Sequence, residues 1–251
     1  MFQHILNYSD LHNQISILSI NKYTNANLYV KNLSSKKIDQ KTMMQHKFSK
    51  IEVLDLYDNP HVHDLNHLSE TLADPNCGGY INGLSQKGIK NLTKLKNINI
   101  YDNNKIKCLK HTADTLEGLN CGGGLSQISQ KNILDLHNLK YLNIYNNSKI
   151  VDLNHLKELS GLNCGSFYPG RMEIKQNGLR KLDNLKIIYA ENNKNILQNN
   201  VNNIIVDNHD YVHSDIFDIH ILDQHIMNDP KHHARFDTLK KQIIKLYNNM
   251  D

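Results

Sequence analysis

The sequence predicts an α/β solenoid, in which short parallel strands stack into one sheet and short helices or 3₁₀ turns cover its other side. Two interleaved sets of repeated segments predict it. LDLYDNPHV, INIYDNNKI and LNIYNNSKI begin 44 residues apart, at residues 54, 98 and 142, and a weaker copy, IIYAENNKNI, begins at residue 187. Between them lie PNCGG, LNCGG and LNCGS, which begin at residues 75, 119 and 162. Each 44-residue unit therefore holds two half-units of about 22 residues, a period typical of stacked repeat architectures.

The apolar residues of each half-unit follow one spacing, Leu-x-x-Leu-x-Leu-x-x-Asn. The clearest copies begin at Ile51, Leu95, Leu139 and Leu185. The intervening half-units keep this spacing with cysteine in the third apolar place, as in Leu116-x-x-Leu119-x-Cys121. The pattern resembles the 22-residue class of the leucine-rich-repeat family over about 150 residues. The resemblance implies a parallel sheet on a concave face, short helices or 3₁₀ turns on a convex face, and seven or eight repeats in residues 46–208.

Within that family the 22-residue class looks like phosphatase-regulating subunits, and the Leu-Asn-Cys-Gly motif resembles repeat proteins of giant amoebal DNA viruses. Two half-units depart from the consensus. Pro75 stands where an apolar residue belongs, so that strand is expected to be bent or short. An eighth strand is predicted at Val201-x-x-Ile204-x-Val206, after an unusually short connection.

Residues in a strand alternate between its two sides. The second and third apolar places therefore point into the solenoid, and the residues between them face the concave surface. The asparagines that end the repeats turn inward, where an amide can satisfy loop backbone groups that lack a ladder partner. These are Asn59, Asn103, Asn147 and Asn193. The returning segments IKNLTKL, ILDLHNL and LRKLDNL place apolar residues three apart, which predicts a short helix or 3₁₀ turn.

Both ends of the chain leave the repeat. Residues 1–45 predict a helical N-terminal cap, because an open-ended solenoid needs one. Residues 209–251 predict a helical C-terminal cap, with apolar residues on one helical face at Phe236, Leu239, Ile243 and Leu246.

The stretch ILNYSDLHNQISILSINKY also resembles the middle of an F-box, the helical module that docks adaptor proteins onto a ubiquitin ligase. The residues that match the family pattern are Ile5, Leu6, Asp10, Leu11, Leu18, Asn21 and Lys22. The opening Leu-Pro segment of that family is missing. A plain cap and an F-box-like segment are therefore both open interpretations.

Composition narrows the classes of partner. The net charge is +4 and the basic residues are spread along the chain, which gives no nucleic-acid footprint. The chain has neither a run of 18 apolar residues nor the pattern of a signal peptide, so we expect no membrane partner and a cytoplasmic protein, in the host cytoplasm if it is viral.

The four cysteines fit that compartment. Cys77, Cys121 and Cys164 share one repeat position and are expected to be small core residues, with a metal or disulfide ladder as the alternative. Cys108 falls at an outward position, which makes it the thiol expected to react.

Signs of catalysis are weak, and we expect no enzyme, cofactor or metal. His61, His63 and His67 are close in sequence, but they lie in a turn and a return segment, where surface histidines are commoner than zinc ligands. Residues 122–124 lack the Lys-Ser/Thr that follows a phosphate loop. The alternative is a Cys/His-dependent hydrolase that uses Cys108 or His209.

Function is instead expected on the concave face. Tyr57, Tyr101 and Tyr145 share a column, followed by Asp58, Asp102 and Asn146, and the intervening half-units put glycines in those places. The rings can form a binding hot spot or simply cover the glycines of the next strand. The predicted concave positions also carry acidic residues and no Lys or Arg, namely Asp55, Asp58, Asp102, Glu191 and Asp207.

These residues predict a monomeric, non-enzymatic protein–protein interaction scaffold, with a substrate adaptor as one form of it. The partner-binding residues are Tyr57, Asp58, Tyr101, Asp102, Tyr145, Asn146 and Glu191. The acidic columns favour a protein partner with a basic surface. An F-box-type ubiquitin-ligase adaptor proper is the main alternative.

Overall fold

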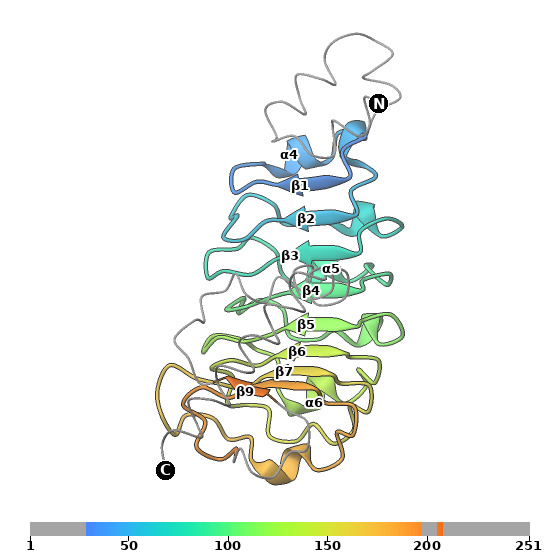
Figure 1. The fold of residues 1–251 in the computed structure, drawn as a ribbon. Helices are drawn as coiled ribbons and strands as arrows, with labels where there is room; N and C mark the ends of the chain where they lie inside the picture. The colour runs from blue at the N-terminus through green and yellow to red at the C-terminus, as the bar shows by residue number, and fades with distance from the viewer. Residues whose placement is uncertain (1–28, 197–204, 208–251) are drawn as a thin grey trace, which may run out of the picture. The chain divides into compact units, whose positions relative to one another are not determined.

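The computed structural model describes residues 29–196 and 205–207. The chain divides into two compact units, residues 1–209 and 210–251, and all described residues belong to the first. They form one parallel sheet in which nine described strands are paired in chain order (Figure 1). The strands are β1 (Asn32–Ser34), β2 (Val53–Asp55), β3 (Asp74–Asn76), β4 (Asn97–Asn99), β5 (Gly118–Asn120), β6 (Tyr141–Asn143), β7 (Gly161–Asn163), β8 (Ile187–Tyr189) and β9 (Ile205–Asp207). The described residues are therefore a leucine-rich-repeat solenoid, as the sequence predicts.

The strands pair in register, so equivalent repeat positions stack on one another. Leu119 of β5 pairs with Ile98 on one side and with Leu142 on the other, and Leu142 pairs with Leu162. These second apolar places are buried throughout β1–β8. Each of these eight strands therefore inserts its central side chain into the core.

The convex side holds short helices and 3₁₀ turns, as predicted for the returning segments. The α-helices are α4 (Gln40–Met43), α5 (Gln86–Ile89) and α6 (Gln130–Ile133). The 3₁₀ helices are η1 (His46–Phe48), η2 (Asn66–Leu68), η3 (Lys110–Thr112) and η4 (Gln176–Leu179). Their core-facing residues, such as Ile89 and Ile133, are fully buried. Burial of an apolar stripe thus sets the course of each return segment.

The first residue of each α-helix links neighbouring half-units. The amide of Gln40 accepts the backbone N–H groups of His63 and Asp64 and donates to the Asp64 carbonyl. Gln86 makes the same contacts with Lys107 and Cys108, and Gln130 makes them with Val151 and Asp152. One side chain therefore satisfies three backbone groups that no sheet ladder reaches.

The inward asparagines behave as predicted. Asn103 is 2% exposed, and its Nδ2 donates to the carbonyls of Cys77 and Leu84 while its Oδ1 accepts the Lys105 N–H. Asn59, Asn147 and Asn193 are buried and make equivalent bonds to the preceding unit. In two cysteine half-units this place is taken by Asn82 and Ser126, both buried. The asparagine ladder ties successive turns together.

The sheet has more strands than the seven or eight predicted, because β1 lies inside the segment assigned to the N-terminal cap. Val30, Leu33 and Ile38 of this extra half-unit are buried in the common core. Its sequence hides the repeat, since Ser35 stands in the third apolar place and Ile38 stands in the asparagine place. The remainder of the predicted N-terminal cap and the predicted C-terminal helix lie outside the described residues.

Two further departures concern individual strands. Pro75 keeps its place in the register opposite Leu54, but β3 pairs with β4 only at Asn76 and Asn99. A proline offers no N–H to the next strand, so the ladder to β4 is shortened, although β3 itself has three residues like its neighbours. At the other end, Val206 of β9 pairs with Ile188. The second apolar place is thus Val206 and not Ile204, two residues later than the sequence frame predicted.

Candidate functional site

The candidate site is the side of the sheet that faces away from the core, which we call the outer face. Three columns of side chains occupy it, taken from the first and third residues of each strand and from the residue two places beyond. The third-residue column contains Ser34, Asp55, Asn76, Asn99, Asn120, Asn143, Asn163 and Tyr189. The column beyond the strand ends contains Lys36, Tyr57, Gly78, Tyr101, Gly122, Tyr145, Gly165 and Glu191.

The asparagine column is the most regular feature of the outer face, and the sequence analysis missed it. The Oδ1 atoms of Asn99, Asn120 and Asn143 accept the N–H two residues later, at 2.9, 3.2 and 2.8 Å. Asn76 and Asn163 do the same. The Nδ2 of Asn120 is buried without a hydrogen-bond partner among the described residues. The sequence does show this column, as the Asn that recurs in NIN, LNC and YLN. It was overlooked because the leucine-rich-repeat consensus allows any residue at that position.

Two tyrosines of the next column lie over glycines. A Cβ placed on Gly78 would lie 3.1 Å from Cδ2 of Tyr57, and one on Gly122 would lie 3.0 Å from Cδ2 of Tyr101. Both rings are half-buried. Burial, with Asp102 and then Tyr57 as smaller causes, raises the pKa of Tyr101 to about 12. The rings therefore fill the space that the glycines leave, which is one of the two roles foreseen for them, and each keeps part of its surface accessible.

Tyr145 does not fit the prediction of an accessible binding residue. It is 2% exposed, and its ring meets the Phe167 ring edge-on, with centroids 5.1 Å apart. Burial first, and then the nearby Glu191, raises the pKa of Tyr145 to about 12. Phe167 comes from the loop after β7, at the place that Tyr80 and Gly124 hold in the loops after β3 and β5. The leucine spacing does not extend to this loop position, so it did not reveal the contact with Tyr145.

Asp58, Asp102 and Asn146 also have a different role from the predicted one. Their φ angles are 55°, 54° and 59°, in the left-handed region that Asp, Asn and Gly tolerate best. Oδ1 of Asp102 accepts the Leu125 N–H at 3.1 Å, and Oδ1 of Asn146 accepts the Phe167 N–H at 2.9 Å. Each of these side chains therefore joins the turn after its own strand to the loop of the next half-unit. This structural role explains why Asp or Asn occupies the position.

The remaining charges make the outer face less uniformly acidic than predicted. Asp55 accepts the Ser34 hydroxyl at 2.8 Å and the Tyr57 N–H at 3.0 Å, and Asp74, which the prediction did not include, accepts an amide proton of Asn97. Lys36 lies over the Tyr57 ring, with Nζ 5.6 Å from its centroid. The expected absence of Lys and Arg is therefore wrong at Lys36, which follows β1, the strand that was not predicted. Glu191 is half-buried in the tyrosine column, and Asp207 lies in β9.

The cysteines lie as predicted. Cys77, Cys121 and Cys164 are free and buried, and burial raises the pKa of each thiol to about 12. Cys108 is free and exposed. A thiol that stays protonated is a poor nucleophile and a poor metal ligand, which favours the core interpretation for the first three.

The histidines form a column that the sequence analysis did not recognise. His67, His111 and His155 recur every 44 residues on the convex side. Nε2 of His155 lies 3.0 Å from the carbonyl of Ile133, the last residue of α6. Burial lowers the pKa of His67 and of His111, with nearby backbone carbonyls opposing the shift. In residues 29–196 and 205–207 no three His, Cys, Asp or Glu side chains gather as metal ligands would.

Comparison with known proteins gives similarity to solved structures alone. No protein-family model matches the chain, and no curated protein matches its sequence. Internalin C2 from Listeria monocytogenes is 23% identical with a TM-score of 0.46, over 64% of this chain and 72% of that one. Internalin F from the same organism is 24% identical with a TM-score of 0.41, over 66% of this chain and 54% of that one. The aligned part thus spans about half of internalin F. No helix in the described part of the chain is long and apolar enough to cross a bilayer.

Proposed function

We propose that this chain is a protein–protein interaction scaffold whose outer face binds a protein partner at β2–β4. The observation that carries the proposal is the pair Tyr57 and Tyr101, half-buried rings seated beside Gly78 and Gly122. A ring that is already held in place loses little conformational entropy when a partner covers it. Tyrosine also offers an apolar body with a polar tip, which suits binding hot spots.

The amide column beside the rings supports the same function. Asn76 and Asn99 use Oδ1 for the backbone of their own strands, so their Nδ2 groups remain as donors for a partner. Both side chains are half-buried, whereas Asn120, Asn143 and Asn163 of the same column are buried. The two accessible amides lie on neighbouring strands and suit the carbonyl oxygens of a protein surface better than an apolar ligand.

Charge gives a weaker preference for a partner with a basic surface. Asp55, Asp74 and Glu191 lie on the outer face, and Lys36 opposes them at its β1 end. Charge complementarity of this kind affects the association rate and specificity more than the affinity. From the predicted site we retain Tyr57, Tyr101 and Glu191 and assign the other residues to folding.

The other sequence-based hypotheses remain predictions. The residues that resemble an F-box precede residue 29, so an adaptor function has no support from the described structure. The hydrolase alternative would need His209, which also lies outside the described residues. Monomeric state, cytoplasmic location and a viral source are proposals that rest on the sequence.

A random peptide library displayed on phage and selected against the full chain tests this function. We expect enriched peptides with excess Lys and Arg, which bind the wild-type chain and lose about tenfold in affinity with Tyr101→Ala. Leu134→Ala is the control, because Leu134 is 48% exposed and lies on the convex side, away from the outer face. Peptides that lose affinity only with Leu134→Ala, or no enrichment over an unrelated protein, would overturn the proposal.

A further inference from the structure

A row of exposed apolar side chains follows the edge of the solenoid where the strands end. It belongs to the loops after β3, β5 and β7, the strands of the cysteine half-units. The members, which we call the corner ridge, are Tyr80 (64% exposed), Ile81 (53%), Leu125 (42%), Phe167 (56%) and Tyr168 (61%). Because they recur at every second strand, successive groups are about 10 Å apart.

The exposure follows from an insertion in these loops. Asn103 stands three residues after Ile100, whereas Asn82 and Ser126 stand five residues after Cys77 and Cys121. Gly123, with φ of 89°, turns the chain, and a Cβ there would lie 2.1 Å from Oδ1 of Asp102. The two additional residues therefore cannot enter the core, and their side chains project outward.

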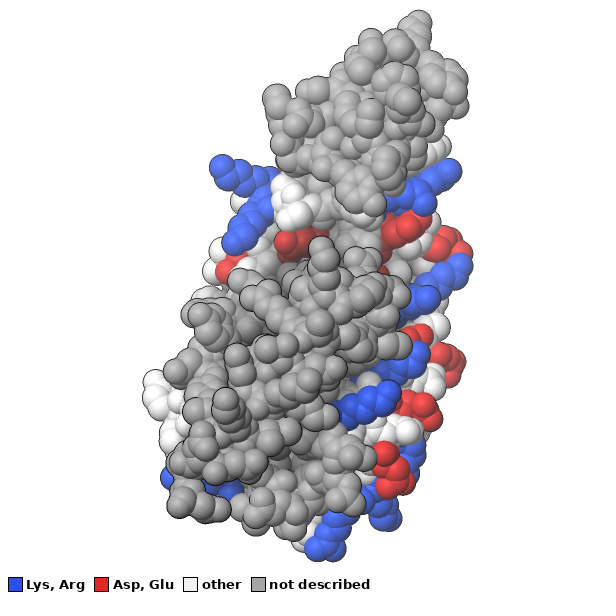
Figure 2. All heavy atoms as spheres, viewed as in Figure 1, with Lys and Arg blue, Asp and Glu red and all other residues white. Residues whose placement is uncertain are grey.

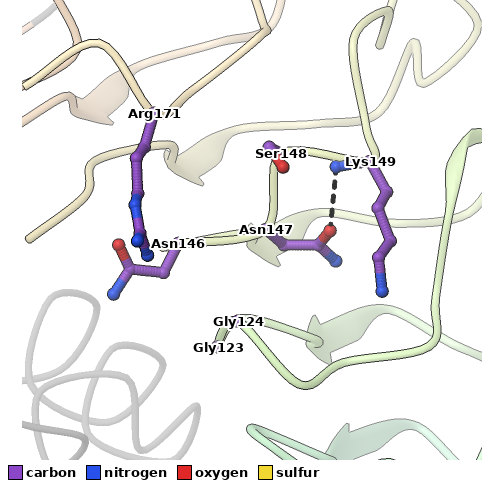
Figure 3. Close-up of a pocket in the computed structure, with 7 residues that line it drawn as sticks. All are labelled: Gly123, Gly124, Asn146, Asn147, Ser148, Lys149 and Arg171. Atoms are coloured by element: carbon purple, nitrogen blue, oxygen red, sulfur yellow. Dashed lines mark hydrogen bonds between the residues drawn. The ribbon is translucent and has the colours of Figure 1, made fainter. Parts of the chain in front are cut away.

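A basic hollow lies beside the ridge at β5–β7. It has a volume of about 210 Å³ and is lined by Gly123, Gly124, Asn146, Asn147, Ser148, Lys149 and Arg171. Figure 3 shows Arg171 and the Asn146 amide on one side, Lys149 on the other and the two glycines below. No carboxylate lines it, and the nearby Asp102 already accepts the Leu125 N–H.

Arg171 is held at the junction of the ridge and the hollow. Its guanidinium carbon lies 5.0 Å above the Tyr168 ring centroid. Within the described part of the chain Arg171 forms no ion pair, whereas Lys31 and Lys140 each meet a glutamate at 2.6 Å. A guanidinium stacked on an aromatic ring keeps its donor edge available for a planar, bidentate acceptor such as a carboxylate.

The surface also shows that ion pairs are concentrated on another edge of the solenoid than Arg171. Figure 2 shows Lys and Arg alternating with Asp and Glu along the edge where the strands begin. Contiguous exposed apolar surface next to a few fixed charges is typical of an interaction site.

We propose that the corner ridge around Leu125 and Phe167, with the Lys149–Arg171 hollow, is a second docking surface that binds an acidic, apolar segment of a partner protein. Large side chains of the segment cover the ridge, and a carboxylate enters the hollow and meets the Arg171 guanidinium. This surface is distinct from the outer face, where the charge preference is the opposite. It allows the scaffold to hold two partner segments at once, independently of what the outer face binds.

The test uses a fluorescein-labelled ten-residue peptide that alternates Glu with Leu and Phe, and a twin with Gln in place of Glu. Binding to the full chain is followed by fluorescence anisotropy at low ionic strength. We expect the Glu peptide to bind, the Gln twin to bind about fivefold more weakly, and Arg171→Gln or Leu125→Ser to weaken the Glu peptide by a similar factor. Circular dichroism confirms that each variant is folded.

Two control variants separate this surface from the others. Lys107→Gln removes an exposed positive charge elsewhere and should leave the affinity unchanged. Tyr101→Ala alters the outer face and should also leave it unchanged, even where it abolishes binding of basic peptides. No binding of the Glu peptide, equal binding of the twin, or no effect of Arg171→Gln would overturn the proposal. Loss with Tyr101→Ala alone would move the acidic segment to the outer face.

Discussion

The Tyr101 ring lies against Gly122 of the next strand, so closely that a Cβ on that glycine would lie 3.0 Å from Cδ2 of the ring. The same Cβ would lie 2.8 Å from the Tyr145 carbonyl on the other side. Tyr57 lies against Gly78 in the same way, so in these two pairs the ring occupies the space that the glycine of the next half-unit leaves. The first glycine of the Cys-Gly-Gly motif therefore recurs because a tyrosine ring of the preceding half-unit packs against it.

Gly122→Ala is expected to destabilise the fold. The methyl group must displace either the Tyr101 ring or the Tyr145 carbonyl, and overpacking of this kind costs about 1 to 3 kcal/mol. Gly124→Ala is the matched control, because a Cβ there meets nothing within 4 Å. Urea unfolding measures both. Equal midpoints for the two variants would contradict the packing of Tyr101 on Gly122.

Asn103→Ala is expected to lower the free energy of unfolding by about 1 to 3 kcal/mol, since it leaves the carbonyls of Cys77 and Leu84 and the N–H of Lys105 without their partner. Asn104→Ala, in the same turn, should change stability by less than about 0.5 kcal/mol. Chemical denaturation again provides the measurement. A cost at Asn104 as large as that at Asn103 would contradict the inward ladder.

Acidification is expected to destabilise the protein through the convex histidines. Burial lowers the pKa of His67 and His111 in the folded state below the ordinary value of 6.5, so the unfolded chain binds protons more readily. The free energy of unfolding should therefore be highest above pH 6.5 and fall as the pH drops through and below that value.

The pH effect is measured as the urea midpoint between pH 8 and pH 5. The double variant His67→Gln/His111→Gln should show a smaller decrease than the wild type. His61→Gln, at an exposed position, should leave the decrease unchanged. An unaltered pH dependence in the double variant would remove these two histidines as its cause.

One thiol of four should react in the native protein. Cys108 is exposed, whereas burial raises the pKa of Cys77, Cys121 and Cys164 to about 12. Brief treatment with iodoacetamide followed by intact mass measurement should give a single adduct, and Cys108→Ser should give none. All four thiols should react in guanidinium. Native modification at any second cysteine would contradict the burial of that residue.

The repeat frame could be predicted from the sequence because its determinants recur. Leu142 and Asn147 occupy the same repeat positions as Ile98 and Asn103, so local spacing defined strand, core and ladder. The repeat spacing missed β1 and misplaced β9, the strands at the two ends of the sheet, where the sequence departs from the consensus. Ser35 hid β1, and β9 pairs two residues later than expected because its connection has no repeat to set it.

The outer face was harder to predict, since the consensus leaves those positions variable. Asp58 was predicted to bind a partner, but it has a positive φ and lies in the turn after β2, where its side chain faces the next half-unit. The buried Tyr145 ring packs edge-on against Phe167, which lies in a loop that the leucine spacing does not cover. The corner ridge also lies in insertions, and only the fold shows that these reach one edge.

The most direct test of the proposed function is photo-crosslinking from the outer face. A benzophenone amino acid replaces Tyr101 in one variant and Leu134, which is 48% exposed on the convex side, in another. Each is irradiated with the basic peptide selected on the wild-type chain, and the products are mapped by mass spectrometry. The proposal predicts a crosslink from position 101 and none from position 134. A crosslink from position 134 alone would contradict binding at the outer face.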